Sequence, residues 1–343
     1  MSELLKIAVD DGYAQTKVAR MSDGQIKTHA IPSRATNGIE AADTDLMGNH
    51  VSTYQTPRHD GQSSQMDTFC VTANATDCDT RYEGYSTSTM NRCIIHDAIA
   101  ASGLAAEEGG DIHLTVTLPI GHYFSDHRAA LIEARQKSLM QPVVQLKGTD
   151  SLHPMFSIKK VSVMPEAAMA YVDYLVADDG GEANDPNETV AVIDVGGNTT
   201  DIALMLPNMN IQQRRSGSIN MGVLNLFEEI NRLIIRNYDS LPKGLPPAKI
   251  EEALKRSGIT NVRGERTDFS PIIQEAIERL AQNLRTEVGK IIQDDADVDR
   301  LIYVGGGAMI MGGTLTRHPS VFVPNEPHMA NARGALKYVI HGS

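Results

Sequence analysis

Two stretches of the chain share one pattern of hydrophobic and polar positions. In residues 190–204, an apolar run ends in an acid and two glycines, and a second apolar run follows. Residues 4–18 repeat this plan, with Asp10, Asp11 and Gly12 at the turn. Valine, isoleucine and threonine favour extended backbone, so each stretch predicts two strands joined by an acidic turn that contains glycine. Two such units about half a chain apart predict two similar domain cores that face each other.

The rest of the pattern alternates between strand and helix periodicity. Residues 4–31 indicate a three-stranded meander, and residues 32–84 indicate a polar insertion with short strands. Further strands are expected at 111–118, 156–163 and 301–304, and helices at 91–102, 125–140, 223–238, 248–256, 270–292 and 329–340. This alternation is typical of an α/β protein. The run of acids and turn formers at 178–188 predicts a domain boundary.

Some local features follow from single residues. Ser125 or Asp126 is expected to cap the helix that runs to about residue 140, and Ser270 to cap the helix at 270–292. His113 is expected on the exposed face of its strand.

Both acidic turns have the chemistry of a phosphate site. Gly196 and Gly197 have no Cβ to block a ligand, and successive backbone N–H groups in such a turn form an anion-binding concavity. Asp194 ends its strand, where a carboxylate can hold a metal-bound water, and Lys17 lies within reach of a phosphate beside the first turn. The alternative for either stretch alone is an ordinary hairpin. A polyphosphate with Mg²⁺ held between the two turns explains both together.

Two more segments carry candidate chemistry. Gly305, Gly306 and Gly307 follow an apolar strand, and glycines let a backbone approach a flat ring or a ribose closely. The alternative is a flexible loop. Pro165 suits the first position of a helix, which places Glu166 in the first helical turn, where a carboxylate is electrostatically favoured. The alternative role for Glu166 is that of a helix-start acid.

Composition excludes several classes of protein. The 343 residues are 41% hydrophobic and 22% charged, which is typical of a globular protein long enough for two domains. With 31 basic and 43 acidic residues the net charge is −12, which argues against a large DNA-binding surface. No stretch approaches the roughly 20 apolar residues of a membrane helix, and the N-terminus lacks the pattern of a signal peptide.

The cysteines indicate a reducing compartment. Cys70, Cys78 and Cys93 are odd in number and lack paired spacing, so a cytoplasmic location is expected. Cys93 and His96 are three residues apart, but no second close pair accompanies them, so buried apolar cysteines are favoured over a zinc site.

The order of these motifs resembles the actin-like ATPase superfamily. The motifs run from residue 7 to residue 338 and therefore cover the whole chain. Four of them are most similar to the ParM (StbA) family of plasmid-segregation actins. The motifs that carry the resemblance are Asp10-Asp11-Gly12 with Lys17, Thr117-Leu118-Pro119, Met164-Pro165-Glu166, Ile193-Asp194-Val195-Gly196-Gly197-Asn198-Thr199-Thr200-Asp201, Gly305-Gly306-Gly307-Ala308 and Ala332-Arg333-Gly334-Ala335.

The resemblance implies an α/β, actin-like fold with two related domains around a nucleotide cleft. Domain I would span residues 1–178, with an outer insertion at about 32–84, and domain II would span residues 179–328. A C-terminal helix at 329–343 would return to domain I. The implied activity is ATP hydrolysis, with ATP or GTP and Mg²⁺ as cofactors, coupled to dynamic filaments. The implied partners are further copies of the chain, head to tail, and a DNA-binding adaptor protein of a partition system.

The resemblance also implies roles for individual residues. Glu166 would orient or deprotonate the attacking water, and Asp10 and Asp194 would hold Mg²⁺ through its waters, with Asp194 also part of the catalytic set. Asp201 would support its loop rather than react. The nucleotide-binding residues would be Asp11, Gly12, Lys17, Gly196, Gly197, Asn198, Thr199, Gly305, Gly306 and Gly307.

Two other functions remain open at the level of sequence. A sugar or acid kinase can use the same fold, but it needs a bound hydroxyl substrate and usually a longer chain with substrate loops. A nucleotide-binding scaffold that does not hydrolyse is the other alternative. Turnover of ATP without an added acceptor separates these functions from a hydrolase.

Overall fold

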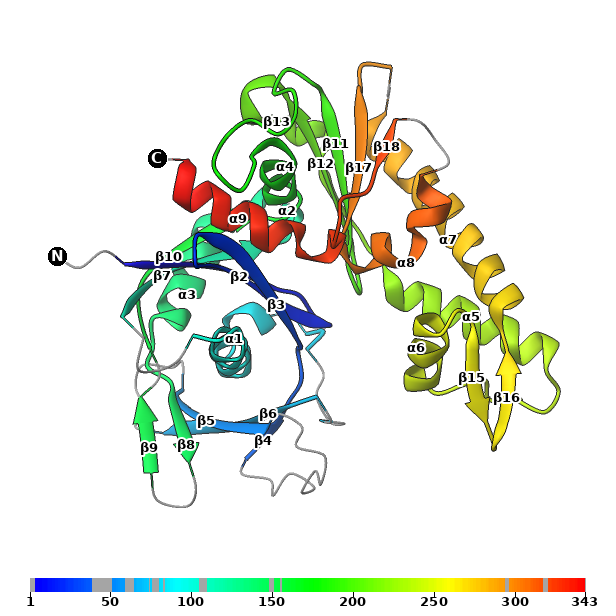
Figure 1. The fold of residues 1–343 in the computed structure, drawn as a ribbon, viewed down its shortest axis with the longest axis horizontal. Coiled ribbons are helices and arrows are strands. Elements are labelled where there is room, and N and C mark those ends of the chain that lie inside the picture. Colours follow the sequence, from blue (N-terminus) through cyan, green and yellow to red (C-terminus); the bar gives the residue numbers. More distant parts are fainter. Residues whose placement is uncertain are drawn as a thin grey trace. The chain divides into compact units, whose positions relative to one another are not determined.

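The chain folds into two compact units. The computed structural model describes residues 4–38, 51–58, 65–73, 75, 80–82, 84–104, 110–147, 151–154, 156–293, 296–316 and 320–342. Unit 1 comprises Met1–Asp185 and Met329–Ser343, and unit 2 comprises Pro186–His328. Each unit has its own hydrophobic core. Figure 1 shows the helices and strands of both units.

Unit 1 is built on a five-stranded sheet. Its order is β10-β7-β1-β2-β3, in which β1, β7 and β10 run parallel, β2 pairs antiparallel with β1, and β3 pairs antiparallel with β2. The strands are β1 (Leu5–Asp11), β2 (Gln15–Ser22), β3 (Gln25–Pro32), β7 (Asp111–Leu118) and β10 (Ser157–Pro165). The meander expected at residues 4–31 is confirmed, because β1, β2 and β3 pair antiparallel in chain order.

A second sheet of unit 1 has the order β4-β6-β5-β8-β9. It comprises β4 (Ala35–Asn37), β5 (Val51–Pro57), β6 (Met66–Thr72), β8 (Val144–Lys147) and β9 (Ser151–Pro154). Helix α1 (Thr89–Ala101) lies between the two sheets, and its apolar side chains belong to the same core (Figure 1). The short strands expected within residues 32–84 are β4, β5 and β6. The hairpin β8–β9, which extends their sheet, was not predicted.

The other helices of unit 1 follow strands of the main sheet. After β7 come α2 (Ile120–Tyr123) and α3 (Arg128–Leu139), and after β10 comes α4 (Ala168–Leu175). A short 3₁₀ helix, η1 (Tyr85–Thr87), precedes α1, and η4 (Pro327–Met329) precedes α9 (Ala330–His341). Helix α9 packs against α4 and β1, so the C-terminal segment belongs to unit 1.

Unit 2 contains a six-stranded sheet. Its main order is β13-β12-β11-β17-β18, and β14 pairs with β12. The strands are β11 (Val190–Val195), β12 (Thr200–Leu206), β13 (Asn210–Ile211), β14 (Gly217–Ile219), β17 (Arg300–Val304) and β18 (Val321–Phe322). Strands β11, β17 and β18 run parallel, whereas β12 and β13 are antiparallel. Two short 3₁₀ helices, η2 (Pro207–Met209) and η3 (Gln213–Arg215), flank β13.

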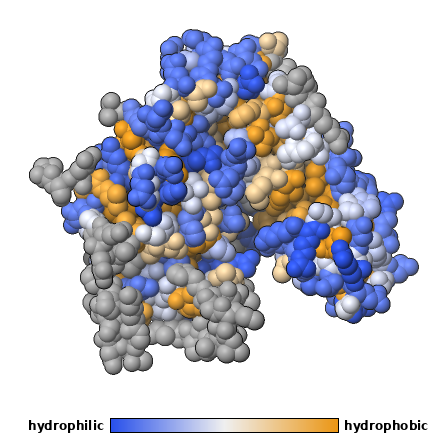
Figure 2. Space-filling model, viewed as in Figure 1, coloured by the Kyte–Doolittle hydropathy of each residue, from blue (hydrophilic) through white to orange (hydrophobic). Residues whose placement is uncertain are grey.

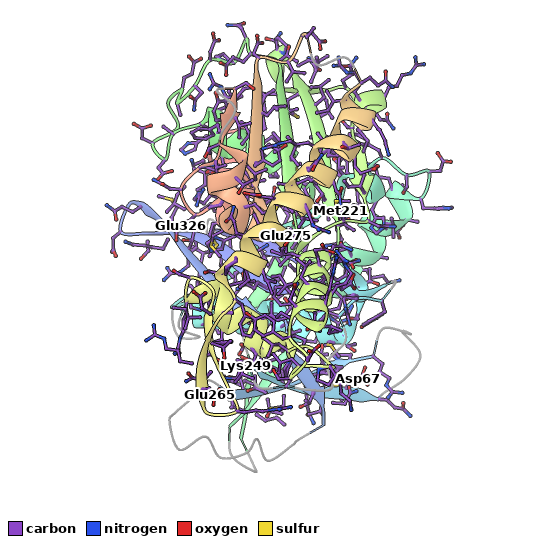
Figure 3. The ribbon with its side chains drawn as sticks, turned by 90° about the vertical axis from the view of Figure 1, so that its right-hand side faces the viewer. Asp67, Met221, Lys249, Glu265, Glu275 and Glu326 are labelled. Atoms are coloured by element: carbon purple, nitrogen blue, oxygen red, sulfur yellow. The ribbon has the colours of Figure 1, made fainter. Side chains whose placement is uncertain are left out.

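Helices cover this sheet with their apolar side chains. They are α5 (Val223–Asn237), α7 (Ser270–Ile292) and α8 (Gly305–Leu315). Helix α6 (Pro247–Lys255) packs on α5 and on the hairpin β15 (Ile259–Val262) and β16 (Glu265–Asp268). Hydrophilic residues cover most of the α6 and β15–β16 region in Figure 2. Glu275 lies on the exposed face of α7, where it pairs with Arg279 at 2.6 Å (Figure 3).

The two main sheets have the same topology. In each, a strand–turn–strand hairpin (β1–β2 or β11–β12) is extended on one side by an antiparallel strand and on the other by two parallel strands. The repeated pattern at residues 4–18 and 190–204 therefore corresponds to equivalent hairpins. The expected α/β class and the similar cores are confirmed.

Four local expectations were wrong. His113 is only 7% exposed, because β7 is a central strand, and its Nε2 lies 2.8 Å from Ser162 Oγ. The hydroxyl of Ser125 donates to His122 O at 2.8 Å, and α3 begins only at Arg128 without a side-chain cap.

Pro165 is the last residue of β10, not the first of a helix. Because β10 is an edge strand, the missing N–H of a proline is tolerated there. Helix α4 therefore begins at Ala168, and Glu166 lies in the connection. Ser270 is already helical, and its N–H donates to Asp268 Oδ1 at 2.8 Å.

The side chains of Cys70 and Cys93 are buried, and Cys78 lies outside the described residues. None of the described helices combines the length and hydrophobicity that a membrane crossing requires.

Candidate functional site

Three strands of unit 1 end at one edge of the sheet. Because β1, β7 and β10 run parallel, their carboxyl ends meet there. Asp10 is near the end of β1, Thr117 near the end of β7, and Glu166 directly follows β10. The carboxyl edge of a parallel α/β sheet is where ligands usually bind. The topology therefore brings together two of the acids that the sequence selected.

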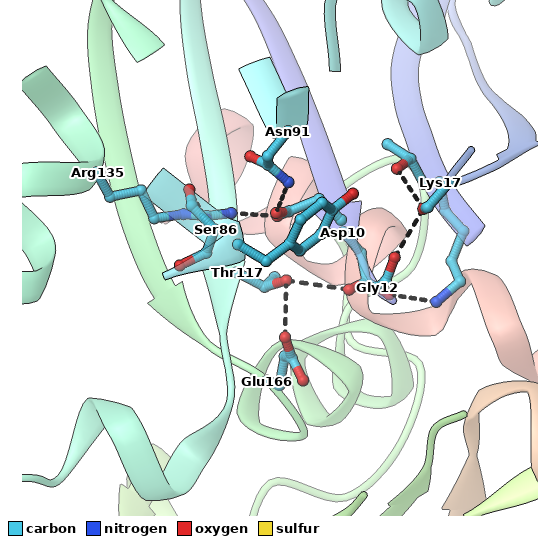
Figure 4. A network of polar contacts seen from close by, with 12 residues as sticks. Asp10, Gly12, Lys17, Ser86, Asn91, Thr117, Arg135 and Glu166 are labelled. Carbon is cyan, nitrogen blue, oxygen red and sulfur yellow. Dashed lines mark hydrogen bonds and ion pairs between the residues drawn. The ribbon is translucent and has the colours of Figure 1, made fainter. Parts of the chain in front are cut away.

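A continuous polar contact joins these groups (Figure 4). Lys17 Nζ donates to Asp10 Oδ2 at 2.8 Å, and Asp10 is 3% exposed. The hydroxyl of Thr117 lies 3.1 Å from Asp10 Oδ1 and 3.4 Å from Glu166 Oε1. A threonine hydroxyl has one proton, so it donates to one of these carboxylates at a time. Thr117 thus links the two acids.

Asp11 has a different environment from Asp10. Its carboxylate is buried, pairs with Arg135 of α3 and accepts a hydrogen bond from Asn91 Nδ2 of α1 at 2.7 Å. Arg135 also donates from Nη1 to Ser86 O at 2.7 Å. Burial raises the pKa of Asp11, and the positive charge of Arg135 opposes that rise. The carboxylate of Asp11 therefore anchors the turn to two helices, and only its backbone is left for a ligand.

Side chains from other segments hold the first turn. Ser33 Oγ donates to Gly12 O at 2.7 Å and lies 2.9 Å from Thr16 Oγ1. A Cβ on Gly12 would lie 3.2 Å from Gln15 O and 3.5 Å from Lys17 Nζ. The absence of a side chain at Gly12 keeps the turn close to the Lys17 ammonium.

The second turn is held through its backbone. Gly196 O accepts the N–H of Val223 at 3.0 Å, and Gly197 O accepts the N–H of Leu224 at 2.9 Å. In a trans peptide the N–H points opposite to the C=O. The N–H groups of Gly197 and Asn198 therefore point away from α5, toward the open side of the turn. Thr199 O accepts the N–H of Gly196 at 2.9 Å and closes the loop.

The turn and α5 approach so closely because of a third glycine. A Cβ on Gly222 would lie 2.6 Å from both Gly196 O and Gly197 O. The sequence reasoning did not assign Gly222 a role. The signal that identifies it is its position directly before α5, whose first N–H groups need acceptors.

Asp194 lies beside both the turn and the glycine segment. It is 7% exposed and pairs across the hairpin with Asp201, which is 2% exposed. Ser218 Oγ donates to Asp201 Oδ1 at 2.5 Å, in keeping with a supporting role for Asp201. Gly305 has φ +85°, and a Cβ there would lie 2.5 Å from Val195 O and collide with the Asp194 carboxylate.

The three glycines after β17 form a helix start rather than a flexible loop. Gly305, Gly306 and Gly307 are the first residues of α8. The first turn of a helix has N–H groups without intrahelical acceptors and carries the positive end of the helix dipole. These groups can bind an oxygen-rich ligand, whereas the sequence suggested only a close approach to a ring or ribose.

Within each unit the predicted residues gather. Unit 1 groups Asp10, Gly12, Lys17 and Glu166, and unit 2 groups Asp194, Gly196–Thr199 and Gly305–Gly307. The sequence reasoning missed the bridging function of Thr117, although Thr117-Leu118-Pro119 was recognised as a motif. Nothing local indicates that Asn91 and Arg135 hold Asp11, because they are 80 and 124 residues away from it.

Comparisons with known proteins agree with this arrangement. The family model for the N-terminal part of plasmid segregation protein ParM matches residues 5–176, and the model for the C-terminal part of the archaeal actin homologue MreB-like matches residues 192–317. A comparison with curated protein sequences gives no match.

Solved structures match over nearly the whole chain. The archaeal actin homologue Ta0583 in complex with ADP is 21% identical, with a TM-score of 0.75, over 99% of this chain and 100% of its own. A 15-stranded ParM filament from Clostridium botulinum is 16% identical, with a TM-score of 0.73, over 98% and 99%. Bacillus thuringiensis ParM with AMPPNP is 16% identical, with a TM-score of 0.64, over 97% and 97%.

These likenesses establish the fold, and the first family model covers half of the chain. Proteins with this fold are generally ATPases. The chain has the actin-like fold and belongs to the ParM (StbA) family.

Proposed function

We propose that this chain is a nucleotide-dependent ATPase that assembles into dynamic filaments and segregates plasmid DNA through a DNA-binding adaptor protein. The observation that carries the catalytic part is the contact from Lys17 through Asp10 and Thr117 to Glu166. A cation for phosphate and two acids lie at one sheet edge, which is the minimum that phosphoryl transfer to water requires.

Nucleotide binding is assigned to both turns. The N–H groups of Gly197 and Asn198 and those of Gly305–Gly307 supply hydrogen-bond donors in unit 2. Lys17 supplies the ammonium in unit 1, and its three N–H donors allow it to contact Asp10 and a phosphate oxygen together. The ADP complex of one structural relative and the AMPPNP complex of another support a nucleotide as the ligand.

The residues fit Mg²⁺. Asp10 and Asp194 are buried carboxylates near the ends of their strands, and carboxylate oxygens are the protein ligands that Mg²⁺ prefers. Mg²⁺ usually keeps several of its waters, so one or two carboxylates are enough to hold it. When bound, Mg²⁺ neutralises the charge that develops on the phosphate oxygens.

Glu166 is proposed to act on the attacking water. It is half-buried, and Thr117 holds one of its oxygens on the side of Asp10. A carboxylate in this place can accept a proton or a hydrogen bond from water and so orient it toward the γ-phosphate. Lys17 offsets the negative charge that the reaction develops. Products are ADP and inorganic phosphate.

Filament formation rests on membership of the ParM family and on the filament among the structural relatives. A head-to-tail contact with open symmetry produces a polymer rather than a closed ring. The net charge of −12 disfavours direct binding to DNA, so a basic adaptor protein is proposed to connect the filament to the plasmid. Hydrolysis within the filament would then weaken subunit contacts.

Light scattering and phosphate release, recorded together after ATP and Mg²⁺ are added, test the proposal. We expect scattering to rise and then to decay as phosphate appears. Phosphate release without scattering would contradict the filament part. The absence of both scattering and phosphate release would contradict hydrolysis and would favour the kinase or the scaffold. Addition of a hydroxyl acceptor then separates these two, because only a kinase would consume ATP.

The variant Glu166→Ala isolates the catalytic step. We expect at least roughly 100-fold slower phosphate release, the lower end of the range for a general base, and longer-lived filaments. Glu133→Ala removes an exposed carboxylate of α3 in the same unit and should change neither signal. Wild-type turnover and filament lifetime in Glu166→Ala would remove Glu166 from the mechanism.

A further inference from the structure

The C-terminal helix contacts the backbone that carries Glu166. The sequence Ala332-Arg333-Gly334-Ala335 lies in α9, and the proposed chemistry gives it no role. Helix α9 packs against α4, the helix that follows Glu166 and Ala167. The position of α9 on α4 therefore bears on the geometry of the catalytic loop.

Two features fix the register of α9 on α4. Gly334 lies so close to α4 that a Cβ would be 2.6 Å from the carbonyl carbon of Met169 and 2.9 Å from the N of Asp173. Arg333 donates to Asp173 Oδ2 from Nε at 3.0 Å and from Nη2 at 2.7 Å, and Lys337 Nζ lies 2.9 Å from Asp173 Oδ1. Because close backbone contact and a two-pronged ion pair both resist sliding, α9 has one position along α4.

In this register Asn331 reaches the catalytic loop. Its side chain is 4% exposed, and Oδ1 accepts the N–H of Ala167 at 3.0 Å. The next N–H toward the N-terminus, that of Glu166, donates to Leu118 O at the end of β7 at 2.8 Å. Two consecutive N–H groups are thus anchored from different elements, one from the sheet and one from α9.

The backbone at Ala167 needs such an anchor. Ala167 is fully buried and has φ +62° and ψ −43°, a conformation that residues with a Cβ rarely adopt. Strained backbone persists only where surrounding contacts hold it. Without the Asn331 acceptor, the peptide between Glu166 and Ala167 can rotate toward an ordinary conformation, and rotation of that peptide re-aims the Glu166 side chain.

We infer that Asn331 is a positioning residue, which holds the Glu166–Ala167 peptide so that the Glu166 carboxylate faces the attacking water. This inference rests on the proposed function of Glu166. It assigns to the C-terminal helix a part in turnover that neither turn supplies. Asn331 acts through the backbone and not by contact with the nucleotide.

Three variants separate positioning from general stability. Asn331→Leu keeps the volume but removes the acceptor, and we expect roughly 10-fold lower kcat, because misplacing a catalytic group costs rate. The Kd for AMPPNP should stay within about twofold, because Asn331 is not assigned to nucleotide binding. Asn331→Asp keeps an acceptor oxygen and should recover most of kcat. Lys337→Met removes one ion pair of the α9–α4 contact but leaves the close approach of Gly334 and the Arg333–Asp173 pair, which are enough to hold the register, so it should lower the melting temperature while kcat stays at the wild-type value.

A double variant distinguishes this inference from the proposed function. If Asn331 acts through Glu166, adding Asn331→Leu to Glu166→Gln lowers kcat no further. A reduced kcat in Glu166→Gln with wild-type kcat in Asn331→Leu would overturn the inference alone. Equal losses of kcat in Asn331→Leu and Lys337→Met would also overturn it, because they indicate general destabilisation. Wild-type kcat in Glu166→Gln would overturn the proposed function. If Asn331→Leu does not fold, Asn331→Ala carries the same comparison.

Discussion

The two hairpins occupy equivalent places in equivalent sheets, yet they are held by different means. In unit 1, Asp10 lies opposite Lys17 across β1 and β2, and in unit 2 the equivalent pair is Asp194 and Asp201 across β11 and β12. The first pair carries opposite charges and forms an ion pair, with Lys17 Nζ 2.8 Å from Asp10 Oδ2. The second places two acids opposite each other, where like charges disfavour the pairing.

The turns themselves differ in the same way. Charged and polar side chains hold the first turn, namely Arg135 and Asn91 on Asp11 and Ser33 on Gly12. Backbone hydrogen bonds to α5 hold the second turn, and they depend on the absence of a side chain at Gly222. One topology therefore permits two ways of holding a turn between strands, and each predicts its own weak point.

The largest expected effect is in the first turn. Arg135→Met removes the charge that faces the buried Asp11 carboxylate, and breaking a buried ion pair from one side costs about 3 to 5 kcal/mol. Hydrogen exchange of β1 and β7 amides, read separately from β11 and β12, should show the loss in unit 1. Arg128→Met on the exposed start of the same helix should cost less than about 1 kcal/mol.

A second substitution sharpens that result. Adding Asp11→Asn to Arg135→Met removes the unpaired charge, so part of the lost stability should return. If the double variant is as unstable as the sum of the two single variants, the two residues act independently and the charged anchor of the first turn is refuted.

In the second turn, Gly222→Ala should lower the free energy of unfolding by about 3 kcal/mol, the upper end of the range for overpacking. The new methyl group would collide with the carbonyl oxygens of Gly196 and Gly197, which belong to one backbone turn and cannot move independently. Exchange should rise in β11 and β12, and nucleotide affinity should fall. Gly289→Ala in α7 is the matched control. Its Cβ meets nothing within 4 Å, and alanine is about 1 kcal/mol better than glycine in a helix. Equal effects of both substitutions would contradict the close approach at Gly222.

How much could be predicted from sequence depended on the range of the contacts involved. Both hairpins follow from local patterns, because strand residues and turn glycines are adjacent in the chain. The place of Glu166 was predicted less well. Pro165 is the last residue of β10 and pairs with Leu118 of β7, which lies 47 residues earlier in the chain, so local sequence does not reveal that the strand extends to Pro165. The burial of the Asp11 carboxylate depends on Arg135, and the N–H directions in the second turn depend on α5. Such contacts leave no periodic trace in the sequence.

The smallest expected effect concerns acid sensitivity, which should distinguish the units. Burial, assisted by the positive charge of Arg92, lowers the pKa of His96 from 6.5 to about 3. His96 is 1% exposed, and its ring stacks on Phe156 at 4.8 Å. Burial also lowers the pKa of His113. Both of these histidines, the two among the described residues whose pKa is lowered, belong to unit 1.

The sign follows from proton binding. The unfolded chain protonates His96 below its ordinary pKa of 6.5, whereas the folded chain does so only near 3. His96 should therefore lower the stability of unit 1 as the pH falls through this range, by about 2 kcal/mol at pH 5, whereas the raised pKa of Asp11 acts in the opposite direction. His96→Leu has no such proton to bind, so the difference in unfolding free energy between pH 7 and pH 5 should shrink by that amount. His122→Gln, at an exposed histidine of α2, should leave the difference unchanged. If His96→Leu is as acid-sensitive as the wild type in the exchange of β1 and β7 amides, His96 is not the group that makes unit 1 more sensitive to acid than unit 2.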